Sequence, residues 1–265
     1  FTTITLNEIF RQAQKSAIVT NAHAINDGEY PDLHRKDGDF FYLYRDTEEQ
    51  TAQTVAQLCA SRLPRTYGPQ IRKKIQVIAP SRKGGSGTMR LNELLQSVLN
   101  PKVPERREKK FRDRIFREGD KVMQIRNNYD LSWERENNGM RQEGTGVYNG
   151  DIGRIEKIDL TQECMIIRFD DRVVSYDFSL VDELELAYAV TVHKSQGSEY
   201  PVVILPIYRF SPRLMTRNLL YTAVTRASEM VILVGDEEQV KAMVDNNRQS
   251  KRYSALAKRL STYEA

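Results

Sequence analysis

The stretch IQVIAPSRKGGSGTMRLNELLQSVL, residues 75–99, decides the fold. It opens with an apolar run of strand length that ends at a proline, which predicts a buried strand over Ile75–Ala79. A glycine-rich turn, residues 81–87, follows, and apolar residues at helical spacing then predict a helix from Thr88 to Leu99. A strand that leads through a turn into a helix is the repeating unit of α/β domains with parallel strands.

The same alternation extends to both sides of this stretch. Apolar runs predict strands over residues 40–44, 188–192, 202–206 and 230–234, and apolar spacing predicts helices over residues 6–27, 48–63, 212–226, 237–246 and 252–263. A capping box at Thr5–Glu8 begins the first helix and Gly28 ends it, while Pro64 is expected to end the second. The chain is therefore expected to contain an α/β domain with a parallel sheet.

The pattern changes near Ile115, where short strands replace helices. Strands are predicted over residues 122–126, 151–158, 165–169 and 173–176, with turn signals at Asn149-Gly150 and Asp170-Asp171. The polar stretch from Ser132 to Gly146 is expected to be a mobile surface loop. Such closely spaced strands indicate a small antiparallel barrel. We expect this barrel, residues 116–185, to be inserted in a discontinuous α/β domain of residues 1–115 and 186–265.

Composition narrows the class of protein. Hydrophobic residues make up 40% of the 265, and no apolar run reaches the ~20 residues that span a bilayer. No signal peptide is visible, so a cytoplasmic protein without membrane contact is expected. Cys59 and Cys164 form no metal-ligand spacing and are expected to be reduced thiols, so no metal site is predicted. The net charge is +4, and the basic run over residues 102–117 is either a solvated face or a surface that follows phosphates.

Three stretches combine groups that carry chemistry. AVTVHKSQGSE, residues 189–199, ends a strand in a turn of hydroxyl, imidazole, ammonium and amide groups, and ligands of open α/β sheets bind at the carboxyl ends of strands. NLLYTAVTRA, residues 218–227, places Arg226 at the end of a helix, and EIFRQA, residues 8–13, places Arg11 near a helix start. Taken singly, each has an ordinary alternative: a polar loop, a cation at a helix C-terminus, and a solvated charge.

Together, these stretches resemble superfamily 1 DNA helicases of the RecD/TraA type. Residues 191–199 resemble motif V, residues 220–227 motif VI and residues 6–13 motif IV, while FREGDKVMQIRNNY (116–129) and VYNGDIG (147–153) match the branch that carries an inserted SH3-like barrel. The resemblance implies a RecA-like, P-loop-NTPase-type α/β fold. It also implies the C-terminal motor half of a bacterial 5'–3' helicase of DNA repair or recombination, as in the exodeoxyribonuclease V alpha subunit.

The resemblance assigns roles around ATP. Arg11 and Arg226 are the expected arginine fingers, because a guanidinium can bind phosphate oxygens as charge develops on them. Gln12, Gly197 and Glu199 are expected near the nucleotide. ATP and Mg²⁺ would be bound mainly by a first RecA-like domain, since this sequence has no Gly-x-x-x-x-Gly-Lys-Ser/Thr loop. The isolated chain is therefore expected to be inactive.

Single-stranded DNA is the expected partner, and three groups of residues are assigned to it. The candidates are Thr191, His193 and Ser195 in the motif V stretch, Ser81, Arg82, Lys83 and Thr88 at a helix start whose N–H groups suit phosphate, and Lys121, Arg126, Asn127 and Tyr129 in the barrel. The glycine-rich turn is alternatively a plain surface loop. Further partners implied by the resemblance are the first RecA-like domain and, as an open possibility, RecBC-like subunits.

Two functions of other classes compete with the helicase hypothesis. In a non-catalytic module for single-stranded nucleic acid, the barrel would bind the strand while Arg11 and Arg226 would be structural. A complete α/β phosphotransferase is disfavoured, because the sequence lacks a phosphate loop with its lysine.

Overall fold

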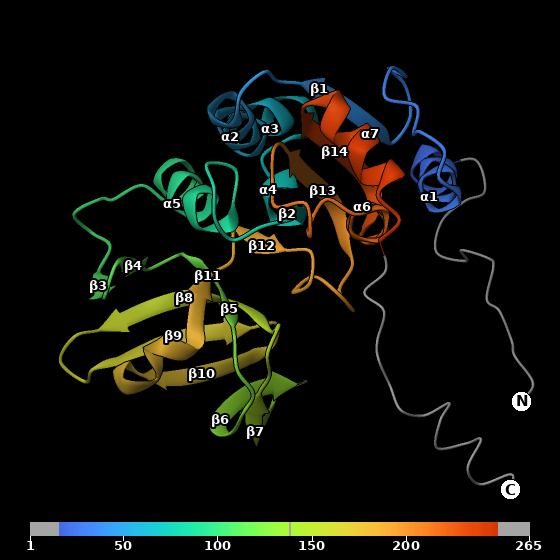
Figure 1. Cartoon of the computed structure of the whole chain (residues 1–265). Coiled ribbons are helices and arrows are strands. Elements are labelled where there is room, and N and C mark those ends of the chain that lie inside the picture. Colours follow the sequence, from blue (N-terminus) through green and yellow to red (C-terminus); the bar gives the residue numbers. More distant parts are fainter. Residues whose placement is uncertain (1–15, 138, 249–265) are drawn as a thin grey trace, which may run out of the picture.

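The computed structural model describes residues 16–248 except residue 138. Five parallel strands form the central sheet of the α/β unit in the order β1-β14-β13-β2-β12 (Figure 1). They are β1 (Phe40–Tyr44), β2 (Ile75–Ala79), β12 (Ala189–Thr191), β13 (Tyr200–Ile207) and β14 (Ala227–Gly235). The predicted α/β fold with a parallel sheet is confirmed.

Helices cover both faces of this sheet. One face packs against α1 (Ala17–Asp27), α6 (Arg217–Val224) and α7 (Glu237–Asp245). The other packs against α2 (Glu48–Gln57), the π-helical η1 (Leu58–Arg62), α3 (Leu63–Tyr67), α4 (Ile71–Lys74) and α5 (Thr88–Leu99). Successive side chains of a strand point to opposite faces, so Val77 belongs to one apolar layer and Ile78 to the other.

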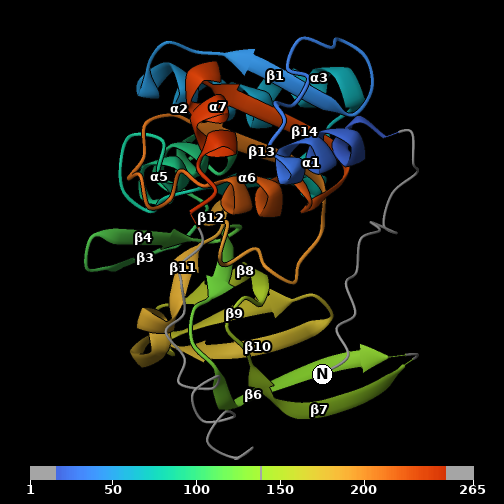
Figure 2. The same cartoon turned by 45° about the vertical axis from the view of Figure 1, so that its right-hand side comes forward.

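The chain leaves the α/β unit after α5 and returns at β12, and the intervening residues 108–186 form a second part that we call the β unit. It contains the hairpin β3 (Glu108–Phe111) and β4 (Arg114–Arg117), the 3₁₀ segment η2 (Phe178–Glu183), and the strands β5 (Lys121–Gln124), β6 (Asn128–Asn137), β7 (Met140–Val147), β8 (Ile152–Asp159), β9 (Cys164–Phe169), β10 (Arg172–Asp177) and β11 (Leu184–Leu186). The last seven form an antiparallel sheet in the order β11-β5-β8-β9-β10-β6-β7, which lies on the β12 side of the α/β unit (Figures 1 and 2).

The predicted mobile loop over Ser132–Gly146 is wrong, because this stretch belongs to the long hairpin of β6 and β7. Its strands pair through polar side chains, such as Arg135 with Gln142, so the stretch lacks the apolar alternation by which strands are identified. The Trp133 ring lies across Gly144, where an added Cβ would come within 2.4 Å of that ring. Glycine at this position therefore allows the two strands to pack.

Three predicted helix bounds also differ from the structure. The helix that begins at Glu48 does not end at Pro64 but continues through η1 into α3, where the proline occupies the first turn, the position at which a missing N–H is tolerated. The helix expected from residue 212 begins only at Arg217, where Thr216 accepts a hydrogen bond from the Leu219 N–H. Gly28 ends α1 as predicted, with φ at +88°. The single helix predicted over residues 6–27 is wrong at residue 16, because Ser16 has extended backbone and α1 begins only at Ala17.

Asp120, directly before β5, joins the β unit to the α/β unit. Its carboxylate is fully buried and accepts four hydrogen bonds: from Asn100 (2.7 Å) and Tyr188 (2.9 Å) on one oxygen, and from Gln96 and the Arg117 N–H (both 2.6 Å) on the other. Burial raises the pKa of Asp120, while these hydrogen bonds act in the opposite direction. The carboxylate thus ties α5 to the turn before β5 and to the residue before β12.

Two further contacts fix this junction. Met123 of β5 is buried within the apolar layer of the α/β unit that contains Ile78. The fully buried Gln76 side chain of β2 accepts a hydrogen bond from Lys121 at 2.7 Å and donates to the carbonyl oxygens of Ala187 and Tyr188. The β unit is therefore packed and hydrogen-bonded to the parallel sheet rather than loosely attached.

The Asp120→Asn substitution tests this junction. It replaces one carboxylate oxygen, which accepts two donors, with an NH₂ group that cannot accept them. We expect the free energy of unfolding in urea to fall by about 3 kcal/mol. Asp130→Asn, at an exposed aspartate of the same unit, is the matched control and should change it by less than about 0.5 kcal/mol. Equal stability of Asp120→Asn and wild type would show that the carboxyl group is already neutral in the folded protein.

Candidate functional site

The motif V and motif VI stretches meet in space through Arg226. Residues 192–199 connect β12 to β13, and α6 leads through Arg226 into β14. The Arg226 guanidinium donates from Nη1 to the Ser198 carbonyl oxygen at 3.1 Å and from Nε to the Thr222 carbonyl oxygen at 3.2 Å. The backbone of the same residue accepts from the Tyr200 N–H at 2.8 Å. One residue therefore holds the end of the β12–β13 connection against the end of α6.

The β12–β13 connection runs from the carboxyl ends of the strands to their amino ends. Thr191 ends β12 level with Ala79, at the carboxyl end of β2, as predicted for the start of this turn. Tyr200, however, begins β13 beside Ala227, the first residue of β14. The contact of Arg226 with Ser198 therefore lies at the amino ends of two strands, not at the carboxyl edge where the whole turn was expected.

Residues of this connection differ in what they present to solvent. His193, Gly197 and Glu199 are exposed, and Thr191 is half-buried. Gly197 has φ at +86°, and an added Cβ there would meet no atom within 4 Å, so the space beside it is open. Ser195 is fully buried and its hydroxyl donates to the Val192 carbonyl oxygen at 2.8 Å. In this conformation the Ser195 side chain shapes the turn and is not available to a ligand.

Tyr200 is a residue that sequence reasoning missed at this site. Within the described part of the chain, its hydroxyl is the buried side-chain oxygen that has no hydrogen-bond partner. Burial raises the pKa of Tyr200, while the neighbouring Ser198 and Arg226 act in the opposite direction. Buried side-chain donors without a hydrogen-bond partner are rare in folded proteins. The only signal in the sequence was its position directly after the motif V stretch.

Three backbone N–H groups of the glycine-rich turn before α5 already donate to acceptors of the protein itself. The Ser86 N–H donates to the Glu48 carboxylate (3.0 Å), the Thr88 N–H to Ser81 O (3.0 Å), and the Met89 N–H to the carbonyl oxygen of Arg82 (3.1 Å). The expectation of free N–H groups for phosphate is therefore wrong for these three positions. Arg82 and Lys83 remain exposed, although Arg82 forms a salt bridge with Glu185 at 2.6 Å.

The candidates in the β unit divide into two groups. Lys121 is half-buried at the junction with the α/β unit, so its predicted place on an open DNA-binding surface is wrong. Arg126, Asn127 and Tyr129 are exposed at the β5–β6 connection, where Arg126 pairs with Asp182 at 3.1 Å.

An exposed aromatic pair lies beside these residues. The Tyr129 and Tyr148 rings meet edge to face with centroids 5.7 Å apart, and the two residues are 64% and 42% exposed. Asn127 connects the two segments, because its amide donates to the Tyr129 hydroxyl and accepts from the Asn149 N–H. Tyr148 was not predicted as a site residue, although it lies in the quoted stretch over residues 147–153.

Arg11 and Gln12 lie outside the described residues, so the structure gives no position for either. No helix in the described part of the chain is long and apolar enough to cross a membrane.

Comparisons with known proteins identify the family. Residues 91–169 match the family described as "ATP-dependent RecD-like DNA helicase SH3 domain", and residues 186–234 match the "UvrD-like helicase C-terminal domain". An ATP-dependent RecD2 DNA helicase of Deinococcus radiodurans is 30% identical over 261 residues, which is 98% of this chain and 32% of that protein. The chain belongs to the RecD-like superfamily 1 DNA helicases. It spans about a third of the length of this relative.

Other relatives agree with this family. The RecBCD enzyme subunit RecD of Mycolicibacterium smegmatis is 39% identical over 117 residues, 44% of this chain and 20% of that protein. Among solved structures, the Pif1 helicase from Candida albicans matches with a TM-score of 0.52 and 15% identity, over 98% of this chain and 61% of that one. Bacteroides Pif1 in complex with ADP-AlF3 and ssDNA matches with a TM-score of 0.51 and 16% identity, over 98% and 56%. These two structures support the fold.

The unpartnered hydroxyl of Tyr200 leads to a stability prediction. Because the group gives up hydration without gaining a hydrogen bond, Tyr200→Phe should leave the melting temperature unchanged or raise it. The matched control is Tyr176→Phe, which removes a fully buried hydroxyl that donates to Gln124 at 2.9 Å and should cost about 1 kcal/mol. Calorimetry measures the melting temperature of both variants. An equal loss of stability in Tyr200→Phe and Tyr176→Phe would mean that the Tyr200 hydroxyl has a hydrogen-bond partner in solution.

Proposed function

We propose that this chain supplies the second motor domain of an ATP-dependent 5'–3' DNA helicase whose ATP-binding loop lies in another RecA-like domain of a longer protein. Membership of the RecD-like family supports the proposal, and so does the union of motifs V and VI at Arg226. We also propose the division into a RecA-like domain (1–115 and 186–265) and an inserted SH3-like domain (116–185). RecBC-like subunits are candidate partners, since relatives are named as RecBCD subunits.

The main support for this proposal is the hydrogen bond from the Arg226 guanidinium to the Ser198 carbonyl oxygen. A guanidinium is planar and always charged, and its fork of N–H groups suits paired hydrogen bonds to phosphate oxygens. Open space at Gly197, the exposed Glu199 and the buried Tyr200 hydroxyl fit the edge of a nucleotide site. We propose Arg226, with Arg11, as the arginine fingers and Gln12, Gly197 and Glu199 as nucleotide neighbours. ATP and Mg²⁺ would be held mainly by the other domain.

The same contact offers a route from ATP to DNA. Ser198, which is bonded to Arg226, and His193, an exposed DNA candidate, belong to one short connection whose start is fixed by the buried Ser195. If a phosphate group attracts the Arg226 guanidinium, either its hydrogen bond to Ser198 would lengthen or the β12–β13 connection would move together with the guanidinium. The state of the nucleotide would thereby change the position of His193.

Three exposed surfaces are proposed to contact single-stranded DNA. The first contains Thr191 and His193, and the second contains Arg82 and Lys83 of the turn over residues 81–88. The third is the tyrosine pair with Arg126 and Asn127, which combines rings for base stacking with a guanidinium for phosphate. Ser195, Lys121, Ser81 and Thr88 are proposed to support these surfaces from within.

The ATPase activity of the full-length protein, stimulated by single-stranded DNA, tests the role of Arg226. Arg226→Ala should lower turnover about 10³-fold while nucleotide binding is largely retained, because the guanidinium acts on charge that develops during phosphoryl transfer. Arg226→Lys should recover little, since an ammonium group lacks the paired donor geometry. The isolated chain should show no turnover.

Arg213→Ala is the matched control, because Arg213 is exposed on the segment that precedes α6. Its turnover should equal that of wild type. Unchanged turnover in Arg226→Ala would remove the finger assignment and favour a non-catalytic module for single-stranded nucleic acid.

The tyrosine pair is the observation that favours this second candidate function. Tyr148→Ala should weaken binding of a single-stranded oligonucleotide by about 1–3 kcal/mol if a base stacks on the ring. Tyr67→Ala is the control, since Tyr67 is 52% exposed at the end of α3 in the other unit. Fluorescence anisotropy measures both affinities, and an equal affinity of Tyr148→Ala and Tyr67→Ala would exclude stacking on this pair.

A further inference from the structure

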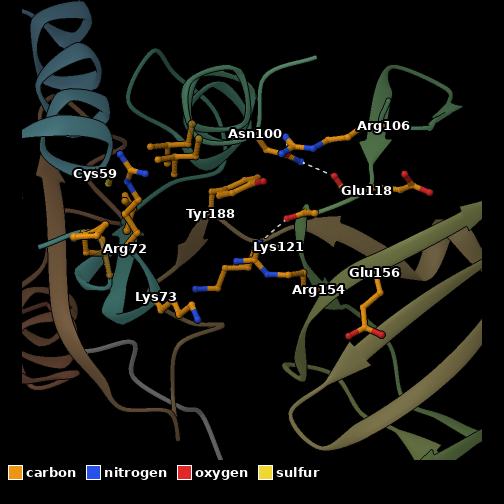
Figure 3. A pocket seen from close by; sticks show the side chains of 16 residues that line it. Cys59, Arg72, Lys73, Asn100, Arg106, Glu118, Lys121, Arg154, Glu156 and Tyr188 are labelled. Carbon is orange, nitrogen blue, oxygen red and sulfur yellow. Dashed lines mark hydrogen bonds between the residues drawn. The ribbon is translucent and has the colours of Figure 1, made fainter. Parts of the chain in front are cut away.

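A cavity of about 530 Å³ lies where the α/β unit meets the β unit. Its walls come from α4, α5 and the start of β2 on one side, and from β5, β8 and the turn before β5 on the other. This volume lies within the range of pockets that bind small molecules, roughly 300–1,000 Å³. Figure 3 shows side chains of both units reaching into the same space.

Five basic side chains line this cavity: Arg72, Lys73, Arg106, Lys121 and Arg154. Their polar partners in the described part of the chain are neutral. Arg72 donates to the Ala60 carbonyl oxygen, Arg154 to the Gly119 carbonyl oxygen, and Lys121 to the Gln76 amide. Arg106 donates to the Asn100 amide. No salt bridge joins any of the five to a carboxylate among the described residues.

The two acidic residues of the lining are engaged elsewhere. The Glu118 carboxylate accepts from the backbone N–H groups of Arg107 at 3.1 Å and Ile158 at 2.8 Å. Glu156 pairs with Arg168 at 2.5 Å, outside the cavity lining. Backbone N–H groups leave the negative charge of Glu118 in place, so the lining has a net positive charge, in which five cations outnumber two carboxylates.

Burial makes this arrangement costly. It lowers the pKa of Lys121 to about 8, and the charge of Arg154 acts in the same direction. The side of the cavity formed by the α/β unit carries Arg72 and Lys73 but is otherwise largely apolar, with Ile75, Val77, Leu95 and Leu99, and the Tyr188 ring also contributes to the lining. Basic groups facing an apolar and aromatic wall match a ligand that carries phosphates at one end and a flat ring at the other.

The cavity is separate from the site of Arg226. Ile75 and Val77 point to the face of the sheet that packs against α2 and α5, whereas α6, which leads to Arg226, packs on the other face. It also lies by the first residues of β2, while the glycine-rich turn follows the last. An inference about this cavity therefore does not depend on the proposed helicase function.

We propose that the cavity between the α/β unit and the β unit binds a phosphorylated small molecule of nucleotide size, with its phosphates among Lys73, Lys121 and Arg154 and its ring against the apolar wall. Because the ligand contacts both units, binding would stiffen their junction. A nucleoside diphosphate has the required size and chemistry.

Calorimetric titration of the chain with ADP at low ionic strength, with EDTA present, tests the proposal. The Lys73 side chain forms no hydrogen bond among the described residues, so its removal should disturb the fold little. Lys73→Ala combined with Arg154→Ala therefore removes two cations, with only the Arg154 contact to Gly119 lost. We expect this double variant to weaken ADP binding about tenfold or more. Arg141→Ala on β7, outside the cavity, should bind ADP as wild type does.

Pyrophosphate is the second probe, and ADP should bind at least about tenfold more tightly if the apolar wall holds a ring. Equal affinities for the two probes would overturn the nucleoside assignment. Absence of binding at millimolar ADP, or the same affinity in the double variant as in Arg141→Ala, would overturn the site. Loss of binding in Arg226→Ala alone would place the nucleotide at the motif V turn, which overturns the cavity proposal and leaves the helicase proposal intact. Thermal denaturation of the double variant without ligand verifies that it is folded.

Discussion

The buried carboxylate of Asp120 is the constraint on which the placement of the β unit depends. An isolated carboxylate in an apolar interior costs several kcal/mol, and that cost is offset only when hydrogen-bond donors surround both oxygens. The donors here come from α5, from the turn before β5 and from Tyr188 next to β12. All three segments must take their native positions together, so one side chain couples the packing of the two units.

The candidate site is connected to this junction along the chain. Tyr188 directly precedes β12, and the connection from β12 to β13 begins where that strand ends. The connection then leads to the amino ends of β13 and β14, where the Arg226 guanidinium donates to the Ser198 carbonyl oxygen. A sequence of local contacts thus leads from the β unit to the arginine that is proposed to meet phosphate.

The sequence predicted what depends on local pattern. The apolar runs over residues 75–79 and 230–234 are strands of the parallel sheet, and Gly28 ends a helix as expected. It could not predict what depends on distant partners. The Ser86 N–H of the glycine-rich turn seemed free because its acceptor, Glu48, lies 38 residues away. Lys121 seemed exposed because its partner is Gln76 of another unit, and the β6–β7 hairpin was missed because its pairing is polar. The same limit applies to the site, where the motifs named Arg226 but not the buried Tyr200 beside it.

The way in which the β unit is connected has a consequence for how this architecture can change. Its outgoing strand β5 and its returning strand β11 are hydrogen-bonded neighbours, and the Ala187 N–H donates to the Lys121 carbonyl oxygen at 2.8 Å. Because Lys121 and Ala187 are held together, the chain between them affects the parallel sheet only as one closed loop. The entropy of closing a loop grows only slowly with its length, and here the closure is made by strand pairing inside the insert. The β unit can therefore be enlarged, shortened or exchanged during evolution while its two ends keep their positions beside the sheet. This junction is thus a site at which the α/β unit tolerates the insertion of a domain.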